Sequence, residues 1–365
     1  MFCMTTIKRS SKTHSFGFTL IATLLVVPLM TVGVYLALRP NNGNNAVVAT
    51  TENLTENIQT IPTPFPFQEM TIPALKSRSY KSQLGQLEKL SENAFYTSYM
   101  TNYDSDGLRV NGLLTVPKKE NGGSLYPAIV FVHGYIPPQE YQTNVNYATY
   151  VDYLAKSGLV VFKIDLRGHA DSEGEAGGAY YSDDYIVDTL NAVEALRSSE
   201  IVDPDLIGLW GHSMGGNVVF RSFAAGNIPA VVIWAGAGYT YSDLQEYMID
   251  DNSYRPQPTD SPRSRERQKL RDAYGNFDSE HWFWKQIPAT NYLDGVTGAV
   301  QLHHAVDDNV VSIEYSRNLI KALDGSGIKY DLNEYQSGGH NLTGQTFNQA
   351  MQKTVEFFKD NLSSK

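Results

Sequence analysis

The sequence predicts an α/β protein with a mainly parallel, doubly wound sheet that is covered by helices on both faces. Short apolar runs alternate with segments of helical periodicity over most of the chain. Several of these runs are uninterrupted by polar residues, as expected of strands that are buried on both faces. One stretch of about sixty residues interrupts the alternation and predicts an insertion. Alternation of this kind is typical of a parallel sheet wrapped by helices.

The elements follow one another from residue 95 to residue 358. We expect strands at Phe95–Tyr103, Leu108–Val116, Ala128–His133, Leu159–Ile164, Leu206–Trp210, Ala230–Trp234, Ala299–His304 and Ile328–Tyr335. Apolar residues three or four positions apart predict helices over 147–154, 186–196, 215–225 and 347–358. Active sites of such sheets lie beyond the carboxyl ends of the strands, so the candidate residues should follow those ends.

The net charge argues against a nucleic-acid partner, and the cysteine content argues against a disulfide framework or a zinc site. The 365-residue chain has a formal net charge of −10 and no basic stripe interleaved with aromatic residues. An acidic surface repels phosphates, so we expect no nucleic-acid partner. The single cysteine, Cys3, supplies neither a disulfide framework nor a zinc site. The fold must therefore be stabilised by its core alone.

The first 73 residues are expected to lie outside the folded domain, which we place at 74–365. Residues 18–38 are uncharged and mostly apolar, with Lys8, Arg9 and Lys12 in front of them. About 20 apolar residues can cross a bilayer, and the cations predict a cytoplasmic segment 1–17 with the rest of the chain extracytoplasmic. A cleaved secretory signal, which would give a secreted protein, is the alternative. Residues 39–73, rich in Asn, Thr and Pro, predict a flexible linker.

The segment after the expected strand Leu206–Trp210 carries a candidate nucleophile. Its sequence, GHSMGG, places Ser213 between Gly211 and Gly215 at the boundary between a strand and a helix. A serine on such a sharp turn exposes its hydroxyl above the sheet, and glycines two positions away avoid a clash with the neighbouring backbone. We expect His212 to point away from the hydroxyl and to serve in packing.

A serine hydroxyl needs a base, and His340 is the candidate. In sheets with this kind of nucleophile turn the order along the chain is serine, acid, histidine. Among the eight histidines, His340 lies in a glycine-rich loop after the last strand and before the last helix. The acid should follow the preceding strand, where Asp307 and Asp308 are adjacent. One carboxylate of the pair would hold the imidazole, and the other would be solvated or would cap the next helix.

Two further segments follow expected strands. The strand Ala128–His133 is followed by Gly134 and Tyr135, and the backbone N–H groups of Tyr135 and Met214 are the expected donors to an oxyanion.

The polar loop 165–174, DLRGHADSEG, is interpreted as a hydrogen-bonded structural turn near the site. His303 and His304 lie near the aspartate pair, but no H-E-x-x-H pattern accompanies them, so we expect no metal.

Five motifs in sequence order carry a resemblance to a known family: YPAIVFVHGY, DLRGHADSEG, GHSMGG, LHHAVDDNVV and GGHN. Over about 108–362 the chain resembles the α/β-hydrolase superfamily, in its prolyl-oligopeptidase (S9) and dienelactone-hydrolase-like branch. The fourth motif resembles the family pattern H-G-x-x-D-x-x-V. Aligning His303 with the histidine of that pattern places Asp307 on the acid. The resemblance implies an α/β-hydrolase fold, a catalytic triad of Ser213, Asp307 and His340, an acyl-serine intermediate and no cofactor.

The long interruption, about 236–295, predicts a helical lid. Six aromatic residues in it could line an acyl pocket or could pack the lid on the domain: Tyr239, Tyr241, Tyr247, Trp282, Phe283 and Trp284. The expected activity is that of a serine hydrolase similar to a carboxylesterase, acting on small esters, amides or short peptides. An S9-type aminopeptidase or oligopeptidase, acyl transfer to an acceptor other than water, and a silent binding module are the alternatives.

Overall fold

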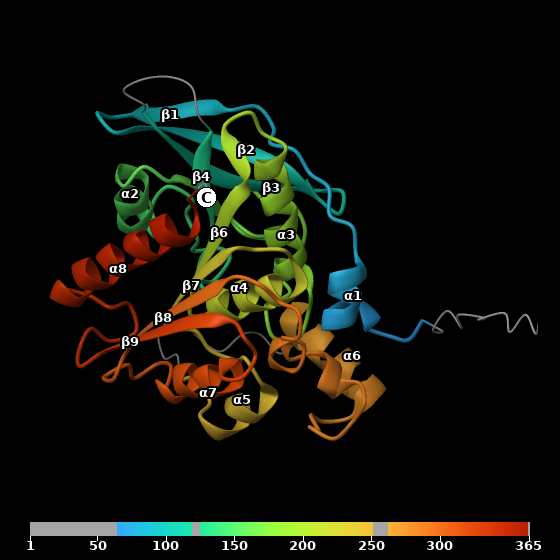
Figure 1. Cartoon of the computed structure of the whole chain (residues 1–365). Helices are drawn as coiled ribbons and strands as arrows, with labels where there is room; N and C mark the ends of the chain where they lie inside the picture. Colours follow the sequence, from blue (N-terminus) through green and yellow to red (C-terminus); the bar gives the residue numbers. More distant parts are fainter. Residues whose placement is uncertain (1–63, 119–124, 251–261, 364–365) are drawn as a thin grey trace, which may run out of the picture. The chain divides into compact units, whose positions relative to one another are not determined.

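A nine-stranded sheet forms the centre of the described part of the chain (Figure 1). The computed structural model describes residues 64–118, 125–250 and 262–363. The described residues belong to one unit, residues 62–365, and residues 1–61 lie outside the described ranges. The strands are β1 Glu88–Glu92, β2 Tyr96–Ser105, β3 Leu108–Pro117, β4 Tyr126–Val132, β5 Val160–Ile164, β6 Val202–His212, β7 Ala230–Trp234, β8 Ala299–Ala305 and β9 Lys329–Tyr335.

The strand order is β1-β2-β3-β5-β4-β6-β7-β8-β9. Strands β1, β2 and β3 pair antiparallel, and β3 is also antiparallel to β5. The six strands β5, β4, β6, β7, β8 and β9 are parallel to one another. All eight expected strands are present. Since the carboxyl ends of the parallel strands meet at one edge, the loops after β4, β6, β8 and β9 come together there.

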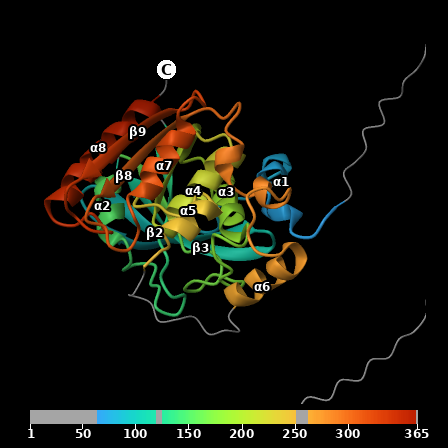
Figure 2. The same ribbon diagram turned by 90° about the horizontal axis from the view of Figure 1, so that it is seen from below.

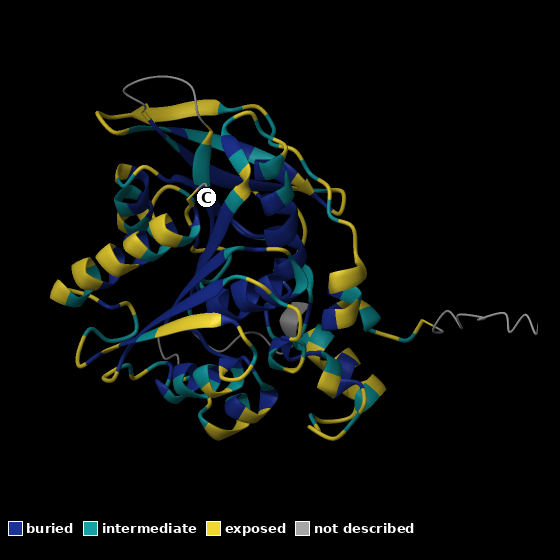
Figure 3. Ribbon diagram, in the orientation of Figure 1, coloured by how far each residue is buried: buried dark blue, intermediate teal, exposed yellow. Residues whose placement is uncertain are grey.

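Five helices cover the two faces of the sheet. They are α2 Ala148–Lys156, α3 Asp184–Arg197, α4 Met214–Ala225, α7 Glu314–Leu323 and α8 Gln345–Asn361. Val130 and Val132 of β4 belong to the core under α3, α4 and α7, whereas Ile129 and Phe131 belong to the core under α2 and α8. Figures 2 and 3 show these layers and the buried sheet between them. The predicted α/β class with helices on both faces is confirmed.

The segment that the sequence predicts to be a lid lies between β7 and β8 and is partly helical where the structure describes it. It contains α5 Tyr241–Glu246, α6 Pro262–Tyr274 and two short 3₁₀ turns, Trp284–Gln286 and Ala289–Asn291. Its aromatic residues pack against one another; Phe283 and Trp284 are buried, and the Phe283 ring stacks on Tyr274 at 3.7 Å between centroids. The Phe283 and Trp284 rings therefore pack the insertion, whereas Trp282 is half exposed.

The predicted linker 39–73 is too long at its carboxyl end. Gln68–Met70 forms a 3₁₀ turn and Ile72–Ser77 forms α1, with Met70, Ile72 and Leu75 buried. Thr71 is the N-cap of α1, and its Oγ1 accepts the N–H of Ala74 at 3.2 Å. The segment is rich in proline and threonine, so its composition predicted a linker where the structure has a short capped helix. The remaining linker residues and the apolar segment 18–38 lie outside the described residues, and within the described ranges no helix has the length and apolarity to cross a membrane.

Candidate active site

Ser213 occupies the turn between β6 and α4 with φ 53° and ψ −118°. This positive φ is unusual for a residue with a side chain and costs on the order of 1–3 kcal/mol. The turn is held from β7, because the Ser213 N–H donates to the Trp234 carbonyl at 2.9 Å. A Cβ on Gly211 would lie 2.4 Å from the Gly215 carbonyl oxygen, and one on Gly215 would lie 2.4 Å from that of Val132. A side chain at either glycine would therefore clash with the neighbouring backbone.

His340 lies in the loop between β9 and α8, and its imidazole faces the same pocket as Ser213. The His340 Nδ1 lies 2.8 Å from Asp308 Oδ2. The Asp308 side chain is fully buried, and that of His340 is 15 % exposed. The ring is therefore fixed on its Nδ1 side by a carboxylate, which leaves Nε2 for exchange of a proton.

The aspartate that holds His340 is Asp308, and the prediction of Asp307 is wrong by one residue. Asp307 instead accepts two backbone N–H groups, from Gly339 at 2.8 Å and from Gly338 at 3.3 Å. Its carboxylate thus holds the backbone of the loop just before His340, and Asp308 holds the ring. Asp307 is exposed to solvent, as expected for one member of the pair, and it caps no helix. Asp308 fixes the ring of His340, and Asp307 fixes the backbone just before it.

Four hydrogen bonds surround the Asp308 carboxylate. Oδ1 accepts the N–H groups of Val310 and Val311, both at 2.9 Å, and Oδ2 faces His304 Nε2 at 3.2 Å as well as His340. Burial would raise the pKa of Asp308, but the hydrogen bonds from His304 and His340 outweigh it and hold this pKa below its ordinary value. Asp308 is therefore ionised at neutral pH, as the acid of a triad must be.

His303 and His304 point to opposite faces of β8. His303 contacts the Tyr335 hydroxyl and Gln301 Oε1, both at 2.8 Å, whereas His304 Nδ1 contacts Ser316 Oγ at 2.8 Å. The two rings thus belong to different polar clusters and do not converge on one point. Among the described residues, no group of three or more His, Cys, Asp or Glu side chains is arranged to hold a metal ion.

A pocket of about 460 Å³ opens above Ser213. The expected oxyanion residue Tyr135 lines it, and Met214 is the first residue of α4, where helix N–H groups lack partners within the helix. The other lining residues are Gly134, Ile136, Asn146, Tyr147, Tyr150, His212, Val310, His340 and Asn341. None of the six lid aromatics lines this pocket, so the prediction that they form an acyl pocket here is not supported.

A buried polar cluster anchors the loop that follows Tyr135. Asp165, at the end of β5, accepts hydrogen bonds from the hydroxyls of Tyr141 at 2.9 Å and Thr143 at 2.7 Å. Lys163 Nζ donates to the Tyr141 hydroxyl at 3.0 Å. Burial raises the pKa of Asp165 to about 6 and lowers the pKa of Lys163 to about 8. These contacts fix the residues between Tyr135 and α2 to the sheet.

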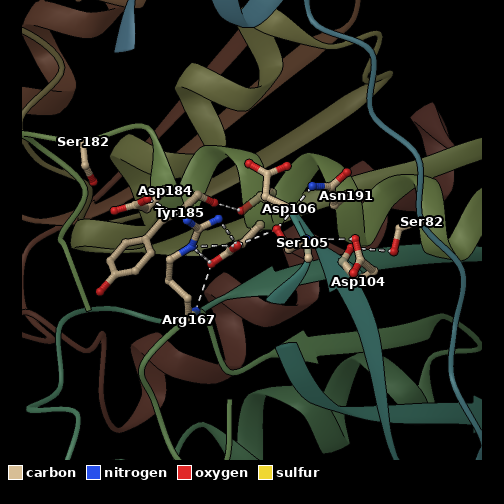
Figure 4. Close-up of polar contacts among 12 residues, drawn as sticks. Ser82, Asp104, Ser105, Asp106, Arg167, Ser182, Asp184, Tyr185 and Asn191 are labelled. Atoms are coloured by element: carbon tan, nitrogen blue, oxygen red, sulfur yellow. Dashed lines mark hydrogen bonds and ion pairs between the residues drawn. The ribbon is translucent and has the colours of Figure 1, made fainter. Parts of the chain in front are cut away.

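The loop 165–174 is the hydrogen-bonded turn that the sequence predicts. The Arg167 guanidinium extends from it to α3, where it donates to Asp184 at 2.7 Å and to Asp188 at 2.7 Å (Figure 4). The Ser105 hydroxyl of β2 donates to Asp188 at 2.7 Å and accepts from Asn191 at 3.2 Å. This network joins β2, α3 and the loop, and its role is structural.

Sequence comparison matches the chain to one family model and to curated relatives. The family model described as the prolyl oligopeptidase family matches residues 145–365, more than half of the chain. Thiohydrolase aneE of Aspergillus aculeatus is 34% identical over 111 residues, which cover 30% of this chain and 32% of that protein. The uncharacterized peptidase YuxL of Bacillus subtilis is 26% identical over 308 residues, 75% of this chain and 41% of that protein. The chain thus spans well under half the length of these curated relatives.

Solved structures share the fold at low sequence identity. A puromycin-hydrolyzing peptidase of Mycobacterium tuberculosis superposes with a TM-score of 0.59 and 20% identity, over 75% of this chain and 41% of that chain. Acetyl xylan esterase 1 of Thermoanaerobacterium sp. superposes with a TM-score of 0.54 and 22% identity, over 81% of this chain and 95% of that chain. The chain has the α/β-hydrolase fold, and it belongs to the prolyl oligopeptidase family.

Proposed function

We propose that the protein hydrolyses small carboxylic esters, amides or short peptides through an acyl intermediate on Ser213. The observation that carries the proposal is the 2.8 Å contact between buried Asp308 and His340, because His340 lines the same pocket as Ser213. His340 Nε2 takes the proton of the Ser213 hydroxyl as its oxygen attacks the substrate carbonyl. The N–H groups of Met214 and Tyr135 stabilise the oxyanion. The protonated His340 then gives its proton to the leaving group, and a water molecule hydrolyses the acyl-serine by the same route.

The described residues of the pocket support an uncharged substrate. The side chains around Ser213 are aromatic, aliphatic, amide or imidazole groups, without a carboxylate or an ammonium among them. An exopeptidase that recognises a free amino terminus needs a carboxylate near the scissile bond, since a buried ammonium requires a partner. Hydrolysis similar to that of a carboxylesterase is therefore the first proposal. Peptide hydrolysis is the second, favoured by the family and by the relative named as a peptidase.

Turnover of p-nitrophenyl acetate beside aminoacyl p-nitroanilides tests the proposal. We expect ester hydrolysis that Ser213→Ala reduces at least 10³-fold, because removing a triad member removes most of the acceleration. Retained turnover in Ser213→Ala contradicts the assignment of the nucleophile. A wild-type chain that cleaves no substrate and is not labelled by a fluorophosphonate is a silent binding module. Transfer of the acyl group to an added alcohol in preference to water would identify an acyltransferase.

We propose separately that residues 18–38 anchor the protein in a membrane with the hydrolase unit on the extracytoplasmic side. Support comes from the length of this uncharged segment and from the cations that precede it. After expression of the full chain, the protein should remain in the membrane fraction through an alkaline wash, and a chain beginning at Pro62 should not. Recovery of a shortened protein in the external medium supports the alternative, a cleaved signal.

A further inference from the structure

His212, which precedes the nucleophile, lies in a chain of hydrogen bonds that joins three loops. The residue is 3 % exposed. Its Nε2 lies 2.9 Å from the backbone carbonyl oxygen of His340, and its Nδ1 lies 2.7 Å from the Tyr147 hydroxyl. The same hydroxyl accepts the backbone N–H of Gly134 at 2.9 Å. The sequence suggested only a packing role for His212, and the structure adds these polar contacts.

The backbone groups at the two ends of this network fix which atom donates in each hydrogen bond. A backbone carbonyl can only accept, so the His212 Nε2 carries a hydrogen and donates it to His340. A backbone N–H can only donate, so the Tyr147 oxygen accepts from Gly134 and its own hydrogen remains for His212 Nδ1. This arrangement requires a neutral imidazole. Burial, reinforced by the nearby His340, lowers the pKa of His212 to about 3 and keeps the ring neutral.

Both ends of this chain adjoin groups that the reaction uses. Gly134 precedes Tyr135, the proposed oxyanion donor, and the other end is the backbone of His340, the proposed base. The fit is tight, because a Cβ on Gly134 would lie 2.7 Å from the Tyr147 hydroxyl and 3.0 Å from His212 Nδ1. The rings of His212 and His340 are 4.6 Å apart between centroids. A shift of either side chain would move a loop that the reaction depends on.

We propose that His212 and Tyr147 are positioning residues that hold the oxyanion loop and the His340 loop in register with Ser213. This inference rests on the function proposed above. It predicts that breaking the chain lowers kcat more than it changes KM, because the groups displaced act on the transition state. A displacement of about 1 Å in a catalytic group can lower the rate on the order of 100-fold.

Tyr147→Phe is the first test, since it removes one oxygen and keeps the ring. We expect kcat for p-nitrophenyl acetate to fall at least about tenfold, with KM within about twofold. Tyr153→Phe on α2, the helix that begins just after Tyr147, is the matched control. The Tyr153 ring lies 6.4 Å from that of Phe347, outside the pocket, and the kcat of this variant should equal that of the wild type. Titration of active sites with a fluorophosphonate normalises each rate to folded enzyme.

Two substitutions of His212 test its two hydrogen bonds separately: the one to the His340 carbonyl and the one to the Tyr147 hydroxyl. They also provide a test if Tyr147→Phe is unstable. His212→Asn keeps an acceptor for Tyr147 and loses the donor to His340, whereas His212→Gln keeps a donor near the position of Nε2 and loses the acceptor. Each should lower kcat. The double variant Tyr147→Phe/His212→Gln should be no slower than the slower single variant, because both break the same hydrogen bond.

The outcomes are distinct. An active wild type with Tyr147→Phe and His212→Gln at wild-type kcat overturns the positioning role and leaves the proposed function intact. Additive losses in the double variant also overturn it, since the two residues would then act independently. A wild-type chain that turns over no ester overturns the proposed function and this inference with it.

Discussion

At the scale of single residues, the family motif alone did not decide which of the two aspartates after β8 is the acid. Two alignments of LHHAVDDNVV fit the family pattern, because His303 and Asp307 are four residues apart and so are His304 and Asp308. The second alignment puts Ala305 in the position of the glycine and Val311 in that of the valine, which is a closer match. The structure selects the second alignment, because Asp308 Oδ2 lies 3.2 Å from His304 Nε2 and 2.8 Å from His340 Nδ1. Ser213 and His340 were predictable because chain order and glycine spacing constrain them.

The division of work between the aspartates predicts unequal effects of the same substitution. Asp308→Asn should lower kcat on the order of 10⁴-fold, since an amide there permits the wrong tautomer of His340. Asp307→Asn keeps an oxygen acceptor for the backbone of Gly339 and should lower kcat less than about tenfold. Steady-state kinetics on p-nitrophenyl acetate compares the two variants. Equal losses, or a larger loss in Asp307→Asn, would return the role of the acid to Asp307.

At the scale of elements, the periodicity of the sequence predicted eight strands and four of the helices that cover the sheet. It missed α7, although Tyr315, Leu319 and Leu323 of this helix are buried, and it missed the edge strand β1. All five residues of β1 are exposed, so an edge strand with the sequence EKLSE has no apolar pattern to find. Segment 64–77 was missed for a different reason, because its prolines and threonines are typical of a linker. In the structure Arg221, buried on α4, donates to the Met70 carbonyl at 2.6 Å, and the Tyr274 hydroxyl donates to that of Pro66 at 2.6 Å.

These contacts predict that the folded unit does not begin at residue 74. A chain that starts at Ala74 loses the buried side chains of Met70 and Ile72, and each should stabilise the fold by about 2 kcal/mol. It also leaves a buried guanidinium without one of its acceptors. We therefore expect a chain starting at Ala74 to unfold at least about 5 °C below one starting at Pro62. Thermal unfolding by circular dichroism compares them, and equal midpoints would show that the segment is a linker.

At the scale of the whole molecule, two cores on opposite faces of one sheet enclose several neutral histidines. Burial lowers the pKa values of His133, His212 and His303 to about 3 each. The unfolded chain binds a proton at each of them below an ordinary pKa of about 6.5, and the folded chain does not. Each therefore contributes a loss of stability as the pH falls from about 6.5 to about 3. Buried His303 is the simplest to test, because it lies outside the pocket.

His303→Gln removes one such group and should make the fold less sensitive to acid. Relative to the variant, the wild type should lose about 1.4 kcal/mol of unfolding free energy per pH unit below 6.5, or about 2 kcal/mol between pH 7 and pH 5. Urea titrations at the two pH values measure this difference. An equal difference in unfolding free energy between wild type and variant at both pH values would contradict this. It would mean that His303 binds protons alike in the folded and unfolded chains.

The measurement that tests the central claim most directly is mass spectrometry of the full chain after reaction with a fluorophosphonate. We predict one adduct per chain, on Ser213, formed in parallel with the loss of esterase activity. Labelling should slow sharply in His340→Ala and in Asp308→Asn, because Ser213 is activated only through that pair. An adduct on a different residue, or ester hydrolysis that persists when Ser213 is fully labelled, would contradict the account.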